Sequence, residues 1–473
     1  MAEGREIPLK VMGVVEKVSG KELSYGEFVE KYLAKNQPVI VTDLTVDWPA
    51  SDDWVLDDGK PNLYFFSEHF GSSRVQVADC GVKEFTDQKR IGMSVSEYIG
   101  RWLQLRSSNE GSDCGGELLY LKDWHFVKEY PEYVAYTTPN IFLDDWLNLY
   151  LDSYRMHVDN DTVQKVNEIC CSDYRFVYMG AKGTWTPLHA DVFRSYSWSA
   201  NICGRKKWYF LSPNQHHLVF DRYMKSSVYD IFEDVCKSKY PGFEKAIWLE
   251  CTQEQHEIIF VPSGWYHQVH NLEDTISINH NWFNAYNISW VWELLLNEYK
   301  VAKEYIEDIR DIADDFEALC QRNLAANAGM DFQDFFIFMI RFAMANLVLL
   351  YLLRIDLRDI TWSSSEIFRH LLLNLRSIQS VILKMQSAYE SEKCDFAIIS
   401  LRETIVDPTF MDFCNALGRS CCIMHDVHEI DINVNHHLLD QLNFFESSGS
   451  TISNPGKMVT FLESALELVQ TID

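Results

Sequence analysis

Two short patterns in the chain combine side chains that bind metal ions. His189 and Asp191 stand two positions apart in "TPLHADVF", and His267 follows a turn in "FVPSGWYHQVH". Two imidazoles and one carboxylate on one face of an ion leave coordination positions open, which is the arrangement used by non-heme iron(II) oxygenases. These three residues are therefore the first candidates for a catalytic metal site.

The His-x-acid pair is a weak signal by itself. A chain with 15 histidines and 69 acidic residues is expected to contain about two such pairs by chance, and this chain has two. The second is His157 with Asp159 in "RMHVDND", where no strand and lysine follow, so we interpret it as an ordinary surface pair. The residues around each pair therefore have to show which pair belongs to a metal site.

The segments around His189 and His267 have the pattern of β-strands. On a strand, residues i and i+2 share a face, so His189 and Asp191 are predicted to point into one cavity, and Lys207 is predicted to point away from Lys206. The run "NICGRKKWYFL" predicts two strands joined by a hairpin at its glycine. Many short runs separated by Gly, Pro or Asn between 117 and 285 predict an all-β sandwich or barrel.

Helices are predicted on both sides of these strands. Ser24 with Glu27 and Ser94 with Glu97 are capping boxes, each opening a short amphipathic helix. Apolar residues recur every three or four positions beyond residue 290, and the apolar run 342–353 is too short to span a membrane, so it predicts a core helix. We divide the chain into a mixed region at 1–136, a core at 137–289 and a helical region at 290–473.

Composition narrows the classes of partner and compartment. The 473 residues are 47% hydrophobic, which favours a globular protein, and the net charge of -27 disfavours nucleic acid and anionic membranes while favouring a basic protein partner. No amino-terminal targeting signal is evident and the twelve cysteines form no CxxC pair, so we expect a cytoplasmic protein with reduced thiols. The spacing in "CCIMHDVH" (421–428) fits no common zinc finger.

Three extended blocks occur in an order that resembles the JmjC-domain oxygenases. They are "TPLHADVF", "SANICGRKKWYFLSP" and "IIFVPSGWYHQVHNLEDTISINHNW", and the resemblance covers about residues 117 to 285. It implies an α+β protein with a double-stranded β-helix (jelly-roll, cupin-like) core, flanked by helices as in the smaller hydroxylase branch. It also implies iron(II) as cofactor, with 2-oxoglutarate and O2 as cosubstrates.

The resemblance assigns roles to individual residues. It implies metal binding by His189, Asp191 and His267, and cosubstrate binding by Lys206, Thr186, Tyr120, Asn279, Asn281 and Ser199. Lys206 would pair with the distal carboxylate of 2-oxoglutarate. Ser199 stands where some relatives have Asn, and Asn201 is the candidate substitute for this contact. His270 and His280 are expected to be hydrogen-bonded residues behind the site.

For the reaction, the resemblance implies C-hydroxylation of a lysine in a protein substrate, the eukaryotic translation termination (release) factor. One alternative is an N-methyl-lysine demethylase of histone-like tails, against which the chain shows no zinc-based reader module. The other is a non-catalytic jelly-roll interaction module, against which the full ligand set argues. A homo-oligomer formed through the carboxy-terminal helices stays open, and no nucleic-acid or membrane partner is expected.

Overall fold

The computed structural model describes residues 9–108, 117–156, 173–233, 235–356, 365–392, 396, 398–427, 434 and 451–471. The chain divides into two compact units. Unit 1 comprises Met1–Pro139 and Tyr174–Asn281, and unit 2 comprises Asn140–Asp173 and Trp282–Asp473. The domain boundaries drawn from the sequence stay a prediction, but residues 140–173 group here with the carboxy-terminal helices and not with the strands.

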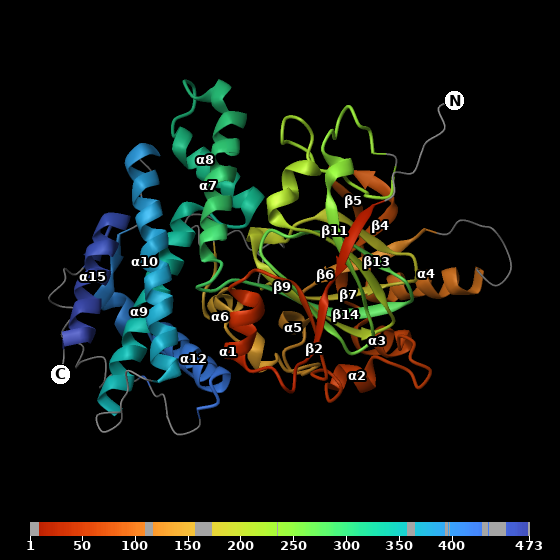
Figure 1. Cartoon of the computed structure of the whole chain (residues 1–473), viewed down its shortest axis with the longest axis horizontal. Coiled ribbons are helices and arrows are strands. Elements are labelled where there is room, and N and C mark those ends of the chain that lie inside the picture. The colour runs from red at the N-terminus through yellow and green to blue at the C-terminus, as the bar shows by residue number, and fades with distance from the viewer. Residues whose placement is uncertain are drawn as a thin grey trace. The chain divides into compact units, whose positions relative to one another are not determined.

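Unit 1 is built on two β-sheets (Figure 1). The larger sheet has nine strands in the order β2 (Glu16–Ser19), β3 (Val39–Thr42), β12 (Ile258–Val261), β9 (Tyr196–Cys203), β14 (Thr275–Trp282), β7 (Arg175–Gly180), β6 (Leu119–Trp124), β4 (Arg74–Glu84), β5 (Asp87–Ser94). The smaller sheet has five strands in the order β1 (Lys10–Val14), β11 (Ile247–Gln253), β10 (Lys206–Leu211), β13 (Tyr266–Asn271), β8 (Trp185–His189).

The strands from β7 to β14 are distributed over both sheets as in a jelly roll. β7, β9, β12 and β14 lie together in the larger sheet, whereas β8, β10, β11 and β13 lie together in the smaller one. This confirms the predicted fold. The predicted hairpin between β9 and β10 is wrong: β9 pairs with β12, and β10 pairs with β11 and β13. Gly204, at φ 72°, lies where the chain crosses between the sheets.

The space between the sheets holds an apolar cluster that draws on both of them. Its members include Trp208 and Phe210 from β10, Val269 from β13, and Ile259 and Val261 from β12. Burying one such side chain contributes about 1.5–3 kcal/mol. Because side chains alternate along β10, the face that carries Trp208 and Phe210 also carries Lys206, and so points that lysine into the sandwich.

Short helices border the sheets of unit 1. They are α1 (Tyr25–Phe28), α2 (Pro49–Asp53), α3 (Leu63–Phe70), α4 (Val95–Ser108) and α5 (Phe126–Glu129), with a π-helical turn η1 (Val29–Leu33) and 3-10 turns η3 (Val192–Arg194), η4 (Pro213–Leu218) and η5 (Phe243–Lys245). Both predicted capping boxes are confirmed: Ser24 and Glu27 cap α1 reciprocally, and Ser94 and Glu97 exchange the same pair of hydrogen bonds before α4.

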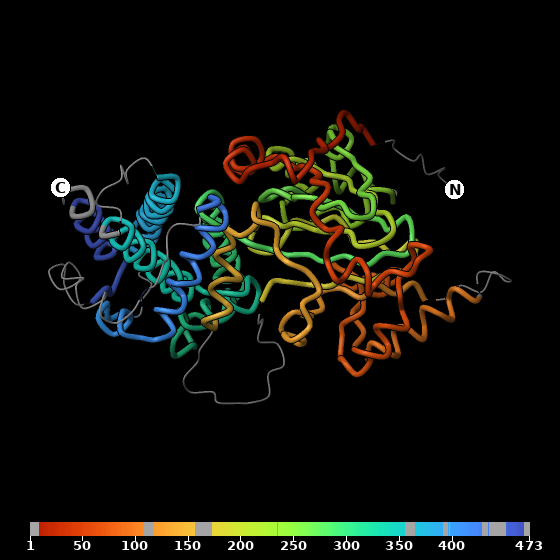
Figure 2. Tube along the Cα trace, turned by 90° about the horizontal axis from the view of Figure 1, so that it is seen from below, coloured from red at the N-terminus to blue at the C-terminus, as the bar shows by residue number. Residues whose placement is uncertain are grey.

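Unit 2 is mainly helical. Its helices are α6 (Trp146–Ser153), α7 (Ile288–Tyr305), α8 (Phe316–Ala328), α9 (Phe332–Asp356), α10 (Glu366–Glu392), α11 (Leu401–Val406), α12 (Pro408–Met424) and α15 (Pro455–Thr471), with 3-10 turns η2 (Asn140–Phe142) and η6 (Glu307–Ile309) and the two-residue strands β15 (Ile399–Ser400) and β16 (Thr451–Ile452). Helices α9, α10 and α15 lie side by side in both views (Figure 1, Figure 2).

Helix α9 contains the apolar run noted in the sequence. The segment Phe332–Arg354 is long and apolar enough to cross a membrane by length and composition, yet 83% of its most apolar window is buried inside the protein. It packs against α10, α12 and α15, as the core-helix interpretation predicted. Near its middle, the fully buried Asn346 accepts a hydrogen bond of 3.0 Å from Asn374 of α10, which is also fully buried.

We expect Asn374→Leu to destabilise unit 2 by about 1–3 kcal/mol, because Asn346 then loses its buried partner. Urea denaturation followed by circular dichroism measures this loss. The double variant Asn346→Leu/Asn374→Leu is the control and should lie closer to the wild type, since it removes both polar groups together. A double variant less stable than the single one would contradict the explanation.

Candidate active site

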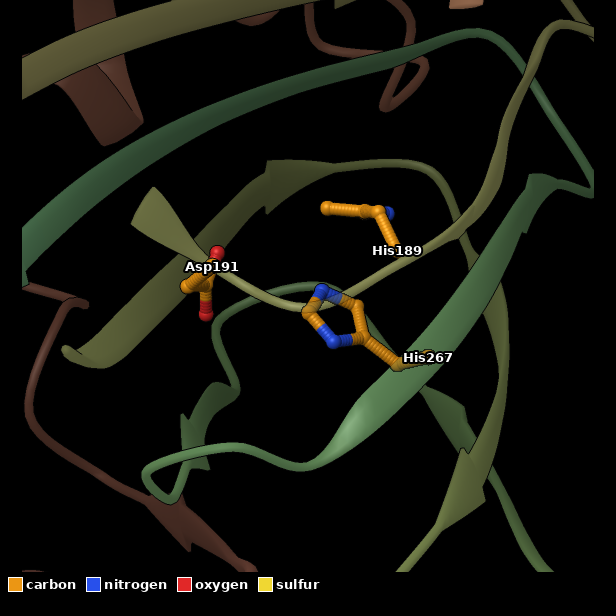
Figure 3. A group of neighbouring side chains, drawn as sticks. All are labelled: His189, Asp191 and His267. Carbon is orange, nitrogen blue, oxygen red and sulfur yellow. The ribbon is translucent and has the colours of Figure 1, made fainter. Parts of the chain in front are cut away.

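His189, Asp191 and His267 converge in unit 1, and their side chains point toward one another (Figure 3). One ligand atom from each lies within 4.8 Å of the others, and among the described residues this is the group close enough to share a metal ion. His189 ends β8 and His267 lies near the start of β13, directly opposite it in the antiparallel ladder. The register of two strands therefore places both imidazoles at one point.

Asp191 reaches the site by a route that the sequence did not predict. Strand β8 ends at His189, so Asp191 lies beyond it, at the residue that precedes the 3-10 turn η3. The turn continues through Phe193 and Arg194, both with positive φ, a strained conformation for such residues. Ser197 donates a hydrogen bond of 2.7 Å to the Asp191 carboxylate and fixes its orientation. The shared strand face predicted for His189 and Asp191 is wrong, although their convergence is right.

On the two imidazoles, the hydrogen bonds to described residues are made by Nδ1 and leave Nε2 for a metal. His189 Nδ1 lies 2.8 Å from the carbonyl oxygen of Pro187, and His267 Nδ1 lies 3.1 Å from that of Trp265. A carbonyl only accepts, so Nδ1 carries the proton and the lone pair is on Nε2. Burial, together with the neighbouring His189, lowers the pKa of His267 to about 4, which keeps this ring neutral. Neutral imidazole is the form that binds metals.

The triad opens onto a cavity of about 430 Å³ that also contains Lys206. Lys206 is 3% exposed, and its ammonium donates to the hydroxyls of Ser277 (2.7 Å) and Tyr120 (3.2 Å). Among the described residues no carboxylate pairs with it, and burial lowers the pKa of Lys206 to about 7. A buried cation surrounded by hydroxyls is a receptor for an anionic ligand.

The other predicted cosubstrate residues line the same cavity. They are Tyr120, Thr186, Ser199, Asn279 and Asn281. The two amides form a chain, because Asn279 donates to Asn281 (3.0 Å) and Asn281 donates to Ser195 (3.2 Å). Their contacts with a cosubstrate stay predictions.

Asn201, the suggested substitute for Ser199, does not line the cavity. Its side-chain amide donates to the backbone carbonyls of Gly204 (2.6 Å) and Glu254 (3.3 Å), so it holds the connection after β9. Ser199 therefore lines the cavity, whereas Asn201 stabilises the backbone beside it.

The remaining polar candidates separate from the site as predicted, where the structure describes them. Lys207 points away from the cavity and pairs with Glu250 at 3.0 Å. His270 Nε2 accepts a hydrogen bond from the Gln268 amide, and His280 Nε2 shares one with the Tyr136 hydroxyl. His157 and Asp159 lie outside the described residues, as does His428 of the "CCIMHDVH" run. No described residue of that run belongs to a metal-binding group.

Several cavity residues were missed by the sequence reasoning: Ser277, Asp87, Arg90, Lys122, Asp123 and Tyr178. Strand alternation from Tyr120 gives Lys122, and alternation from Asn279 gives Ser277, so these two had a local signal. The others depend on how β5, β6 and β7 pair.

The residues present fit iron(II) and 2-oxoglutarate. Two free imidazole nitrogens and one carboxylate form the donor set of the facial iron triad. The unpaired ammonium of Lys206 supplies the charge for a distal carboxylate. We therefore expect the metal at His189, Asp191 and His267, and the anion at Lys206.

The affinity for 2-oxoglutarate should fall as the pH rises above about 7, because Lys206 then loses the proton that pairs with the carboxylate. The dissociation constant should rise roughly tenfold for each pH unit above that pKa. Calorimetry on the manganese(II)-loaded protein between pH 6 and 9 measures it. Lys206→Arg stays charged and should give a flatter profile. A flat wild-type profile would show that Lys206 is not the anchor.

Gly180→Ala should weaken 2-oxoglutarate binding about tenfold and leave metal binding unchanged. A Cβ at Gly180 would clash with Thr184 Oγ1 and lie 2.6 Å from Tyr120 Cδ2, so the tyrosine that accepts a hydrogen bond from Lys206 has to shift. Titration of 2-oxoglutarate and of manganese(II) separates the two effects. Gly100→Ala, where a Cβ meets nothing within 4 Å, is the matched control. Equal losses in both variants would contradict the account.

Comparison with known proteins agrees with this geometry. Residues 25–288 match the family model of the cupin-like domain. The chain is 56% identical over 454 residues to the arginine-specific demethylase JMJ20 of Arabidopsis thaliana, covering 96% of this chain and 97% of that one. It is 43% identical over 319 residues to the 2-oxoglutarate and iron-dependent oxygenase JMJD4 of Danio rerio (67% and 71%), and 38% identical over 320 residues to that of Homo sapiens (67% and 72%). The chain thus belongs to the cupin-like JmjC family and is an iron- and 2-oxoglutarate-dependent oxygenase.

Proposed function

We propose that this oxygenase hydroxylates a carbon of a lysine side chain in a protein, and that its substrate is the eukaryotic translation release factor. The observation that carries the reaction class is a single cavity that joins the His189, Asp191 and His267 triad to the buried ammonium of Lys206. The substrate rests on the resemblance of the sequence to the hydroxylase branch, while the JMJD4 relatives that align over two thirds of the chain support the oxygenase chemistry.

The residues of this chain divide the work of binding. Lys206 with the Tyr120 hydroxyl would hold the distal carboxylate of 2-oxoglutarate, and Ser197 keeps the Asp191 carboxylate turned toward the two histidines. Bound iron(II) supplies oxygen activation coupled to oxidative decarboxylation of 2-oxoglutarate. One oxygen atom of O2 enters the substrate C–H bond and the other enters succinate, with release of CO2.

A second candidate is the demethylation of N-methyl-arginine. It is favoured by the relative with 56% identity, which is named an arginine-specific demethylase. Hydroxylation of an N-methyl carbon gives a hemiaminal, which releases formaldehyde and leaves an N–H group. The same reaction on N-methyl-lysine of histone-like tails is the related alternative. The lysine hydroxylation and the two demethylations begin with the same hydroxylation of a C–H bond. They differ in which carbon of the substrate is oxidised.

Mass spectrometry of peptide products separates the candidates. A lysine-containing peptide of the release factor should gain one oxygen atom, whereas matched N-methyl-arginine and N-methyl-lysine peptides should be left unchanged and release no formaldehyde. The proposal is wrong if a methylated peptide releases formaldehyde while the unmethylated peptide gains no oxygen. The protein would then be a demethylase.

His189→Ala should lower peptide-dependent succinate release by at least about a hundredfold, since it removes a metal ligand. His270→Ala is the matched control, because His270 lies outside the cavity lining. We expect that variant to keep most of the activity. Equal activity of His189→Ala and the wild type would show that the triad does not hold the working metal.

A further inference from the structure

The cavity is also lined by four charged residues and a tyrosine that the reaction described so far does not use. This charged wall consists of Asp87 and Arg90 on β5, Lys122 and Asp123 on β6, and Tyr178 on β7. It lies in the same cavity as His189, Asp191 and His267. A side chain bound in this cavity would therefore share it with these groups.

A bulge in β6 places Asp123 on this wall. Leu121 pairs with Met179 and Trp124 pairs with Val177, so two residues of β6 oppose the single Tyr178 of β7. In a regular strand Lys122 and Asp123 would face opposite sides, but both line the cavity here. Asp123 has φ 58°, a left-handed conformation that Asp tolerates better than most residues.

The Asp123 carboxylate is held in place yet stays accessible. The Tyr178 hydroxyl donates to Oδ1 at 2.6 Å, and Arg90 lies 3.0 Å from Oδ2. The Asp123 side chain nevertheless remains 42% exposed. Asp87 lies 3.4 Å from the same guanidinium and is 51% exposed. Two carboxylates thus share one cation, and their remaining lone pairs are open to a second one.

Lys122 does not neutralise this pair through a described contact. Its side chain is buried, its ammonium donates to Gln88 at 2.7 Å, and among the described residues it forms no ion pair. Burial lowers the pKa of Lys122 to about 8, so its ammonium keeps most of its charge at pH 7, but it lies beneath the surface of the wall. The groups exposed on the charged wall are two carboxylates and one guanidinium, so its accessible part carries a net negative charge.

Building on the proposed function, we propose that Asp123, assisted by Asp87, binds the cationic end of the target side chain. An ammonium or guanidinium would take the open lone pairs beside Arg90, while the aliphatic part of the side chain lies toward the triad. A neutral side chain of the same length gains nothing from these carboxylates. Asp123 is thus a specificity-determining residue that selects basic side chains.

The test compares binding affinities while the charge of residue 123 and the charge of the peptide probe are changed separately and together. The probes are capped pentapeptides with central lysine, arginine or norleucine and glycine elsewhere, bound to the full chain loaded with manganese(II) and 2-oxoglutarate. Asp123→Asn removes the charge, keeps an acceptor for Tyr178, and suits a positive φ. The wild type should bind a cationic probe about tenfold or more tightly than norleucine. Asp123→Asn should bring that ratio close to one and leave the norleucine affinity unchanged.

Glu84→Gln is the matched control. Glu84 is an exposed acid at the end of β4 and does not line the cavity. Its replacement by Gln removes the same charge as Asp123→Asn does. It should keep the wild-type ratio. The proposal is overturned if the wild type does not discriminate, if Asp123→Asn keeps the discrimination, or if Glu84→Gln loses as much of it. This experiment measures binding and not oxidation, so it tests the role of Asp123 separately from the proposed function. If the protein prefers cationic probes through Asp123 but oxidises no lysine, the proposed function is wrong and the role of Asp123 stands.

Discussion

The cross-strand pair of His189 and His267 is the constraint on which the site depends. These residues lie directly opposite each other on β8 and β13, and the centroids of their imidazole rings are 4.3 Å apart. A shift of one residue in this register would turn one imidazole to the other face of the sheet. The apolar cluster between the sheets stabilises this register, and its members Trp208 and Phe210 pack against the His267 ring, so the packing of the sandwich determines whether two nitrogens can meet at one ion.

The cavity is a polar interior built inside an apolar sandwich. Lys206 extends from the strand face that also carries Trp208 and Phe210, which makes an ammonium share the interior with aromatic rings. Burial of an unpaired charge is unfavourable, and this cost lowers the pKa of Lys206. An anionic cosubstrate relieves it. The residue is therefore arranged for binding at the expense of the stability of the empty protein.

Two departures from regular strands bring acids to this cavity. The turn after β8 redirects Asp191 toward the histidines, and the bulge in β6 turns Asp123 to the same side as Lys122. Each involves residues with positive φ. Such strain persists where the surrounding contacts fix it, here Ser197 for one acid and Tyr178 for the other. Regular strands supply the bases of the site, and irregular backbone supplies its carboxylates.

The sequence by itself determined what depends on short-range pattern. Capping boxes at Ser24 and Ser94, the inward Lys206 beside an outward Lys207, and the three metal-binding candidates follow from local chemistry, periodicity and an extended family resemblance. Only the tertiary structure decided that β9 and β10 lie in different sheets, that Asp191 reaches the triad from a turn, and that Asp123 lines the cavity. Strand partners and bulges are set by contacts between segments far apart in the chain, and these leave no periodic trace in the residues themselves.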